Sequence, residues 1–273
     1  MLPILDHFYD PLFNEQHLRK PLAEPRALPG IDWHDQEQLA LLGQFHYAAE
    51  LTGLKTYQEN DTTFHFNNQV FDAGDAESWY HMIRTFQPRR IIEIGSGYST
   101  LMAIKAIQQN KQEDQSYQCE HICIEPYMAP WLEQTAVTVI RKKVEDVGFD
   151  LFTGLQPNDL VFIDSSHMIR PQGDVLFEYF ELLPSLPPGV IVHIHDIFSP
   201  RDYLAEWIIE EKRLWNEQYL LEAFLMSNQE WKIIAALNFL HHNYYQQLKA
   251  TCPYLTPESE PRSFYIQKKA LNP

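Results

Sequence analysis

The sequence predicts an α/β protein, in which a helical cap precedes a doubly wound, mostly parallel sheet of seven strands. Three observations predict this fold. From about residue 90 onward, short apolar runs alternate with longer amphipathic runs, which is typical of parallel strands covered by helices on both faces. Breaks such as Pro187-Pro188-Gly189 separate the later runs. The length of 273 residues suits one large domain, which can bury about three quarters of its unfolded surface.

The first 74 residues have a different pattern. They are rich in proline and aromatic residues, they contain one helical pattern at 36–51, and only 62–71 show a weak strand alternation. Because so few residues would form only a small core alone, we expect residues 1–74 to be a helical cap on a domain spanning 75–273. A helix at 75–86 then leads into the first strand.

Seven apolar runs supply the predicted strands, and seven suffice for a complete doubly wound sheet. They cover residues 90–94, 121–125, 137–140, 159–164, 190–195, 231–239 and 263–268. The helical patterns between them lie at residues 99–110, 129–134, 173–183, 203–211, 216–227 and 240–249.

The amino-acid composition limits the classes of partner that we expect the protein to bind. The 21 Lys and Arg against 37 Asp and Glu give a net charge of −16, which argues against nucleic acid because phosphate contacts need clustered cations. No run approaches the ~20 apolar residues of a membrane span, and the acidic N-terminus is unlike a signal peptide. Cys119, Cys123 and Cys252 form no CxxC pair and indicate a reducing compartment. We therefore expect a cytoplasmic protein with a small-molecule substrate, and self-association into a homo-oligomer stays open.

The sharpest motif follows the first predicted strand. That strand contains Glu93, the turn Gly95-Ser96-Gly97 follows, and a helix begins near Ser99 and Thr100. Backbone N–H groups and the positive end of the helix dipole would face a polar ligand there. Thr100 stands where the third glycine of the nicotinamide fingerprint belongs, so that fingerprint is absent. A tight turn without a ligand is the alternative interpretation.

An acid also ends the second predicted strand. The two carboxylate oxygens of Glu125 can accept hydrogen bonds from both hydroxyls of a ribose, which suits an adenosine-containing cofactor. Alternatively, Glu125 caps a helix at 128–134.

Polar side chains end the fourth and fifth predicted strands. Asp164 and His167 follow one strand, whereas His193, His195 and Asp196 lie at the end of the other. Three interpretations apply. His193 is a core histidine with a buried hydrogen bond, the set Asp164, His195 and Asp196 binds a divalent metal, and His167 or His195 is a general base.

Together these motifs resemble the class I S-adenosylmethionine-dependent methyltransferases over most of residues 75–273. The resemblance implies a Rossmann-like sheet of order 3-2-1-4-5-7-6 whose last strand is antiparallel. It also implies a cofactor that contacts the first motif and the ribose acid and lies beside the third strand. The residues so implicated are Glu93, Gly95, Ser96, Gly97, Ser99, Thr100, Glu125, Val144 and Glu145.

The later motifs resemble the small-molecule O-methyltransferases related to the catechol and macrolide-sugar enzymes. That resemblance implies metal ligands at Asp164, His195 and Asp196, and a catalytic base at His167. Since one ligand is imidazole, Mn, Fe or Co should be preferred over Mg. The predicted catalytic residues are Asp164, His167 and His195, and the predicted acceptor pocket comprises Phe198, Arg201, Tyr203 and Trp207.

We therefore expect an enzyme that transfers a methyl group from S-adenosylmethionine to an oxygen of a small hydroxylated metabolite. One alternative is a protein that binds S-adenosylmethionine for a regulatory or other role. The other is a metal-dependent hydrolase, because His193, His195 and Asp196 form an HxHD motif, although the HxHxDH spacing of such enzymes is absent.

Overall fold

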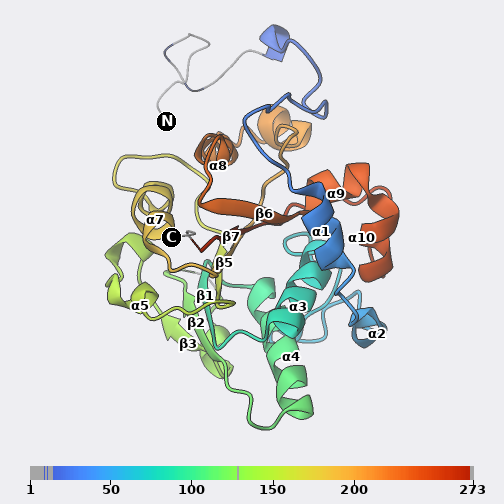
Figure 1. Cartoon of the computed structure of the whole chain (residues 1–273), viewed down its shortest axis with the longest axis vertical. Coiled ribbons are helices and arrows are strands. Elements are labelled where there is room, and N and C mark those ends of the chain that lie inside the picture. The colour runs from blue at the N-terminus through green and yellow to red at the C-terminus, as the bar shows by residue number, and fades with distance from the viewer. Residues whose placement is uncertain (1–8, 10, 12–14, 128, 271–273) are drawn as a thin grey trace.

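A seven-stranded sheet runs through the computed structural model, which describes residues 9, 11, 15–127 and 129–270 (Figure 1). The strand order is β3-β2-β1-β4-β5-β7-β6. β7 is antiparallel to both of its neighbours, and the other strand pairs are parallel. The predicted fold class, strand order and strand direction are thereby confirmed. The strands are β1 Arg90–Ile94, β2 Glu120–Ile124, β3 Thr138–Ile140, β4 Leu160–Ile163, β5 Ile191–Ile194, β6 Trp231–Ala236 and β7 Phe264–Lys268.

Ten α-helices lie within the described residues, and none of these is long and apolar enough to cross a membrane. They are α1 Asp35–Leu42, α2 Ala48–Leu51, α3 Asp75–Phe86, α4 Tyr98–Glu113, α5 Asp150–Thr153, α6 Asp174–Phe177, α7 Leu183–Ser185, α8 Glu217–Leu225, α9 Leu237–Asn243 and α10 Tyr245–Thr251. Short 3₁₀ turns occur at Glu15–His17, Leu132–Gln134 and Val144–Asp146, and π-helical turns at Glu178–Leu182 and Glu206–Glu210.

Helices cover both faces of the sheet, with α3 and α4 on one face and α5 and α7 on the other (Figure 1). Successive strand side chains point to opposite faces, so each strand contributes to two cores. Ile91 and Phe162 pack into the core that contains α3 and α4, whereas Ile92 and Val161 pack into the opposite core. This double burial explains why the strands appear in the sequence as continuous apolar runs.

The N-terminal segment differs from its prediction in two places. The expected helix at 36–51 is two helices, α1 and α2, separated by residues 43–47. The weak strand expected at 62–71 is absent, and turns occupy these residues. Asn68 holds this loop, because its amide donates to the carbonyls of His65 and Phe71 at 2.8 and 2.9 Å. The periodic aromatic residues of the segment enter the core next to α3 instead of pairing as a strand.

The C-terminal half also corrects some predicted boundaries. β6 stops at Ala236, and α9 begins at Leu237, inside the strand expected at 231–239. The side chain of Gln38 contacts the end of this strand, since its Oε1 accepts the backbone N–H of Ala236 at 2.7 Å. The helix expected at 240–249 is divided between α9 and α10. The helices expected at 129–134 and 203–211 shorten to a 3₁₀ turn and a π-helical turn.

The N-terminal segment packs directly on the sheet domain. Trp33 stacks on Phe239 at 4.7 Å, and Arg26 forms an ion pair with Glu222 of α8 at 2.5 Å. α1 lies against β6 and α10. Residues 15–74 therefore share the core of the following domain, and part of this segment lies beside the ends of β5 and β6.

Candidate active site

Gly95 lies where the loop after β1 crosses the end of β4. Its φ is +81°, and a Cβ atom at this position would lie 2.0 Å from the carbonyl oxygen of Asp164. Only glycine adopts this backbone conformation without strain and allows such an approach. The motif glycine thus brings the end of β1 against the end of β4.

Glu93 lies behind this turn and is fully buried. Its Oε2 accepts the hydroxyls of Ser99 and Thr100 at 2.7 and 2.8 Å, and its Oε1 lies 2.6 Å from His121 Nε2. The Thr100 hydroxyl also accepts the N–H of Gly97 at 3.2 Å. Glu93, Ser99 and Thr100, which were predicted to bind cofactor, therefore fix the start of α4 and do not line the adjoining cavity.

A cavity of about 360 Å³ opens in front of the turn at the carboxyl ends of β1, β2 and β4. The Glu125 carboxylate is held at its edge, where Oε1 accepts the N–H of Tyr127 at 2.8 Å and Oε2 accepts the N–H of Ser96 at 3.3 Å. No α-helix begins after Glu125 in residues 129–134, so the interpretation of Glu125 as an α-helix cap is not supported. The predicted residues that line this cavity are Gly95, Glu125, Val144, Glu145 and Asp164.

A second, charged group of side chains lies at the ends of β4 and β5. The Nε2 atom of His167 lies 3.2 Å from Asp164 and 3.4 Å from Asp196, and Nδ1 of His195 lies 3.6 Å from both carboxylates. His167 and Asp196 both have a left-handed backbone, with φ of 57° and 58°. The structure therefore brings together the four residues predicted for catalysis or metal binding.

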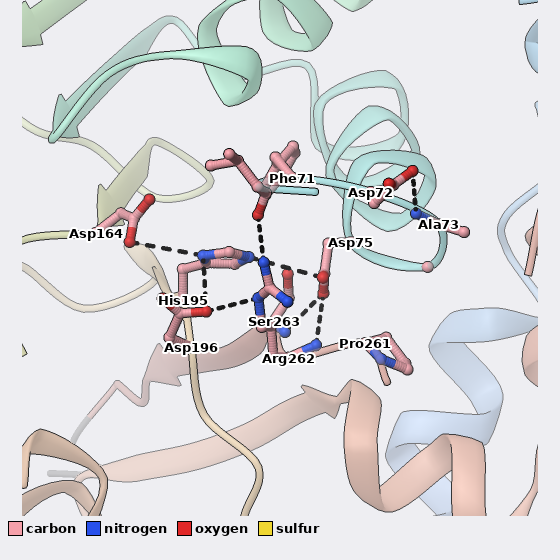
Figure 2. Close-up of polar contacts among 12 residues, drawn as sticks. Phe71, Asp72, Ala73, Asp75, Asp164, His195, Asp196, Pro261, Arg262 and Ser263 are labelled. Carbon is pink, nitrogen blue, oxygen red and sulfur yellow. Dashed lines mark hydrogen bonds and ion pairs between the residues drawn. The ribbon is translucent and has the colours of Figure 1, made fainter. Parts of the chain in front are cut away.

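Three members of this cluster were not predicted. Glu217 of α8, fully buried, lies 2.8 Å from Nδ1 of His167. Arg262 places Nε 2.6 Å from Asp196, and Asp75 lies 3.7 Å from Nε2 of His195 (Figure 2). Asp75 also accepts the backbone N–H groups of Arg262 and Ser263, each at 2.8 Å. These residues lie far from the strand-end motifs in sequence, so no local pattern indicated them.

The carboxylates control the protonation of both histidines. Burial lowers the pKa of His167, but hydrogen bonds to Asp164 and Glu217 outweigh it and hold that pKa well above the usual value. For His195, burial is likewise outweighed by Asp196 and Asp164, which raise its pKa to about 9. Burial would raise the pKa of Asp164, yet the two imidazoles lower it far below its usual range. Without a further cation, these carboxylates favour the imidazolium form of both rings.

His193 is a core residue, as one interpretation predicted, but it lacks the expected hydrogen bond. The side chain is fully buried and stacks on Tyr265 at 4.1 Å. Within the described part of the chain, neither ring nitrogen has a hydrogen-bond partner. Burial lowers the pKa of His193 well below its ordinary value, so the ring is neutral.

Asp164, His195 and Asp196 fit a divalent cation. Each offers one ligand atom, and these atoms lie within 4.8 Å of one another. Nδ1 of His195 is buried and makes no hydrogen bond to a described residue, so the lone pair of the neutral ring can bind a metal between the two carboxylates. Two carboxylates and an imidazole suit Mn, Fe or Co, as well as Mg.

The residues expected to form an acceptor pocket lie past β5. Phe198, Arg201 and Tyr203 line a separate cavity of about 460 Å³. Trp207 does not line it but packs behind Phe198 at 5.3 Å, and it lies 5.2 Å from the Arg262 guanidinium. Contacts from Phe198 to Trp207 and from Trp207 to Arg262 therefore connect the lining of this cavity with the charged cluster.

Part of this chain is similar to known proteins. Residues 92–197 match the family model of a methyltransferase domain. An uncharacterized protein from Archaeoglobus fulgidus is 28% identical over 165 residues, which cover 56% of this chain and 73% of that protein.

Two solved structures align with the chain at low identity. The plantazolicin methyltransferase in complex with SAH is 13% identical, with a TM-score of 0.40 over 71% of this chain and 82% of that chain. Loganic acid methyltransferase with SAH is 9% identical, with a TM-score of 0.36 over 80% of this chain and 99% of that chain. The methyltransferase-domain model matches residues 92–197, and the seven-stranded sheet that contains them has the Rossmann-like methyltransferase fold.

Proposed function

We propose that this protein is an S-adenosylmethionine-dependent methyltransferase that methylates an oxygen of a small hydroxylated molecule. One observation carries the proposal: a single cavity extends from Glu125 and Glu145 to Asp164. A cofactor whose ribose hydroxyls bind Glu125 would point its other end toward the charged cluster. The transferable methyl group would then lie beside Asp164, where an acceptor can approach.

Methyl transfer from a sulfonium requires mainly that the acceptor oxygen is correctly positioned, because the sulfonium already activates the methyl group. The acceptor oxygen must lie ~3 Å from the methyl carbon and opposite the sulfur, because the O–C bond forms as the S–C bond breaks. The proton of the acceptor hydroxyl would pass to Nε2 of His167, whose Nδ1 is held by Glu217 at 2.8 Å. The products would be the methylated acceptor and S-adenosylhomocysteine.

His167 can accept this proton only after its pKa falls. Positive charge beside Asp164 and Asp196 would offset the carboxylates that raise this pKa, and the sulfonium of the cofactor carries such a charge. A divalent cation held by Asp164, His195 and Asp196 would in addition act as a Lewis acid toward the acceptor oxygen. The three ligand atoms within 4.8 Å support such an ion as part of the proposal.

Calorimetry with S-adenosylhomocysteine tests the cofactor. The protein should bind it at about micromolar strength, and Glu125→Ala should weaken binding by about 1–3 kcal/mol, the usual cost of losing a charged hydrogen-bond acceptor. Glu120→Ala is the matched control, because Glu120 pairs with Arg90 at the amino end of β2 and does not line the cofactor cavity. Absence of binding, or tighter binding of NAD, would refute the proposed cofactor.

Chelation tests the metal. Chelator-treated protein should lose methyl transfer, Mn should restore it at least as well as Mg, and Asp196→Ala should abolish the rescue. The acceptor for this assay comes from mass spectrometry of products formed from a panel of catechols, sugars and polyketides. Full activity after exhaustive chelation, with no metal found by elemental analysis, would return these three residues to direct contacts with substrate.

A further inference from the structure

The cavity past β5 has apolar walls and a small number of polar groups. The N-terminal segment contributes Leu22, and the loop after β5 contributes Phe198, Leu204 and Ile209. Its volume of about 460 Å³ lies within the range of about 300–1,000 Å³ that is typical of small-molecule sites. It shares no lining residue with the cofactor cavity.

Two polar groups that line this cavity lack partners within the described residues. Nη1 of Arg201 is buried with no hydrogen-bond acceptor, and burial lowers the pKa of this guanidinium. Asn238 is 1% exposed, and its Oδ1 has no donor although its Nδ2 donates to Glu260 at 2.8 Å. Buried polar groups of this kind are costly unless a ligand or an ordered water completes them.

The two acids that line the cavity, Asp202 and Glu260, have partners among the described residues. Asp202 lies 3.1 Å from Nε of Arg26 and accepts the Tyr219 hydroxyl at 3.1 Å. Glu260 accepts Nδ2 of Asn238 and lies 3.3 Å from His242. The charge of Glu260 acts on Arg201, but the Arg201 guanidinium forms no ion pair with a described residue, so a ligand carboxylate can be its direct partner.

The loop that carries Arg201 is held in place by the surrounding elements. The backbone carbonyl of Arg201 accepts Nη2 of Arg26 at 2.9 Å and Nε2 of Gln218 at 2.8 Å. Gln218 also accepts the N–H of Phe198 at 2.7 Å. A site with fixed walls loses little conformational entropy when a ligand binds.

We propose that this cavity binds an apolar hydroxycarboxylic acid. The carboxylate would accept hydrogen bonds from Arg201, and the hydroxyl would donate to Oδ1 of Asn238, which can only accept. The apolar body would cover Leu22, Phe198, Leu204 and Ile209. The role of this ligand as methyl acceptor rests on the proposed function, whereas its binding does not.

Calorimetry with 3-hydroxydecanoate tests the proposal directly at about 0.15 M salt, which screens the acidic surface. We expect saturable binding at one site. The methyl ester should bind about tenfold more weakly, because it lacks the charge, and decanoate should bind about threefold more weakly, because it lacks the hydroxyl.

Two variants should remove this binding, and one control should keep it. Arg201→Met should lower the affinity at least about tenfold, as loss of a charged hydrogen bond does. Ala205→Trp should fill the cavity from an exposed lining position. Arg89→Met changes the net charge equally at an exposed position beside the amino end of β1, and it should bind as the wild type does.

The outcomes separate this inference from the proposed function. No saturable binding of 3-hydroxydecanoate, equal binding of its ester, or unchanged affinity in Arg201→Met would overturn the inference. A parallel titration with S-adenosylhomocysteine reports on the cofactor cavity alone. Binding of that nucleoside without the hydroxy acid refutes only the second site, whereas the reverse result refutes only the proposed cofactor.

Discussion

At the carboxyl edge of the sheet, one half of the site is formed by backbone groups and the other half by charged side chains. At the ends of β1 and β2, a glycine turn and backbone N–H groups surround an open cavity, and the Glu125 carboxylate is held by two of those N–H groups. At the ends of β4 and β5, charged side chains face one another, and most of them are buried. The first half depends on backbone shape, and the second depends on the balance of charge.

This difference separates two kinds of sensitivity. A site formed by the backbone keeps its shape when most side chains change, but not when a side chain is added where two backbone segments touch. A charge-built site tolerates small shifts in position but not the loss of one charge, because its partners are then left buried and unpaired. The following variants test that contrast.

The largest expected effect is on the charge-built half. His167→Ala removes the proposed proton acceptor between Asp164 and Glu217, so turnover should fall by about 10² to 10⁴, whereas affinity for S-adenosylhomocysteine should change little. Steady-state kinetics and calorimetry measure the two quantities. His46→Ala is the control at an exposed histidine. Near-normal turnover in both His167→Ala and His195→Ala would reject the base hypothesis.

The next largest expected effect is a loss of stability in the half of the site that is formed by the backbone. Gly95→Ala would place Cβ 2.0 Å from the Asp164 carbonyl at a φ of +81°, so unfolding free energy should fall by about 2–5 kcal/mol. Gly97→Ala is the matched control, because a Cβ there meets no atom within 4 Å. Urea unfolding followed by circular dichroism measures both variants. Equal stability of the two would contradict the close approach of β1 and β4.

The same contrast explains how much the sequence could predict. The strands were predictable because double burial leaves continuous apolar runs, and the turn was predictable because Gly95, Ser96 and Gly97 are adjacent in sequence. Asp164 and Asp196 were found because parallel strands end at one edge. Gly95 and Glu125, which were predicted to bind the cofactor, line one cavity, and cofactor binding there stays a prediction.

The rest depends on tertiary contacts. Glu217 and Arg262 reach the cluster from a helix and a strand start that no motif marks. Glu93 fits a cofactor motif in sequence, yet its neighbours Ser99 and His121 satisfy it inside the core. The helix expected at 36–51 breaks between α1 and α2, and Gln38 of α1 then bonds to the end of β6, a contact that local periodicity does not encode.

The smallest predicted effect concerns Arg262, the cation built into the charged half. Its Nε lies 2.6 Å from Asp196, so a bound divalent ion would share that carboxylate with a guanidinium. Arg262→Gln removes one positive charge about 4 Å from the divalent ion, a repulsion of about 2 kcal/mol where water screens it. Manganese affinity, measured by electron paramagnetic resonance, should therefore rise about thirtyfold. Arg213→Gln is the matched control, because Arg213 also stacks on Trp207, at 4.2 Å, but pairs with Glu211 instead of Asp196. Weaker manganese binding in Arg262→Gln than in Arg213→Gln would show that Arg262 organises Asp196 for the metal instead of competing with it.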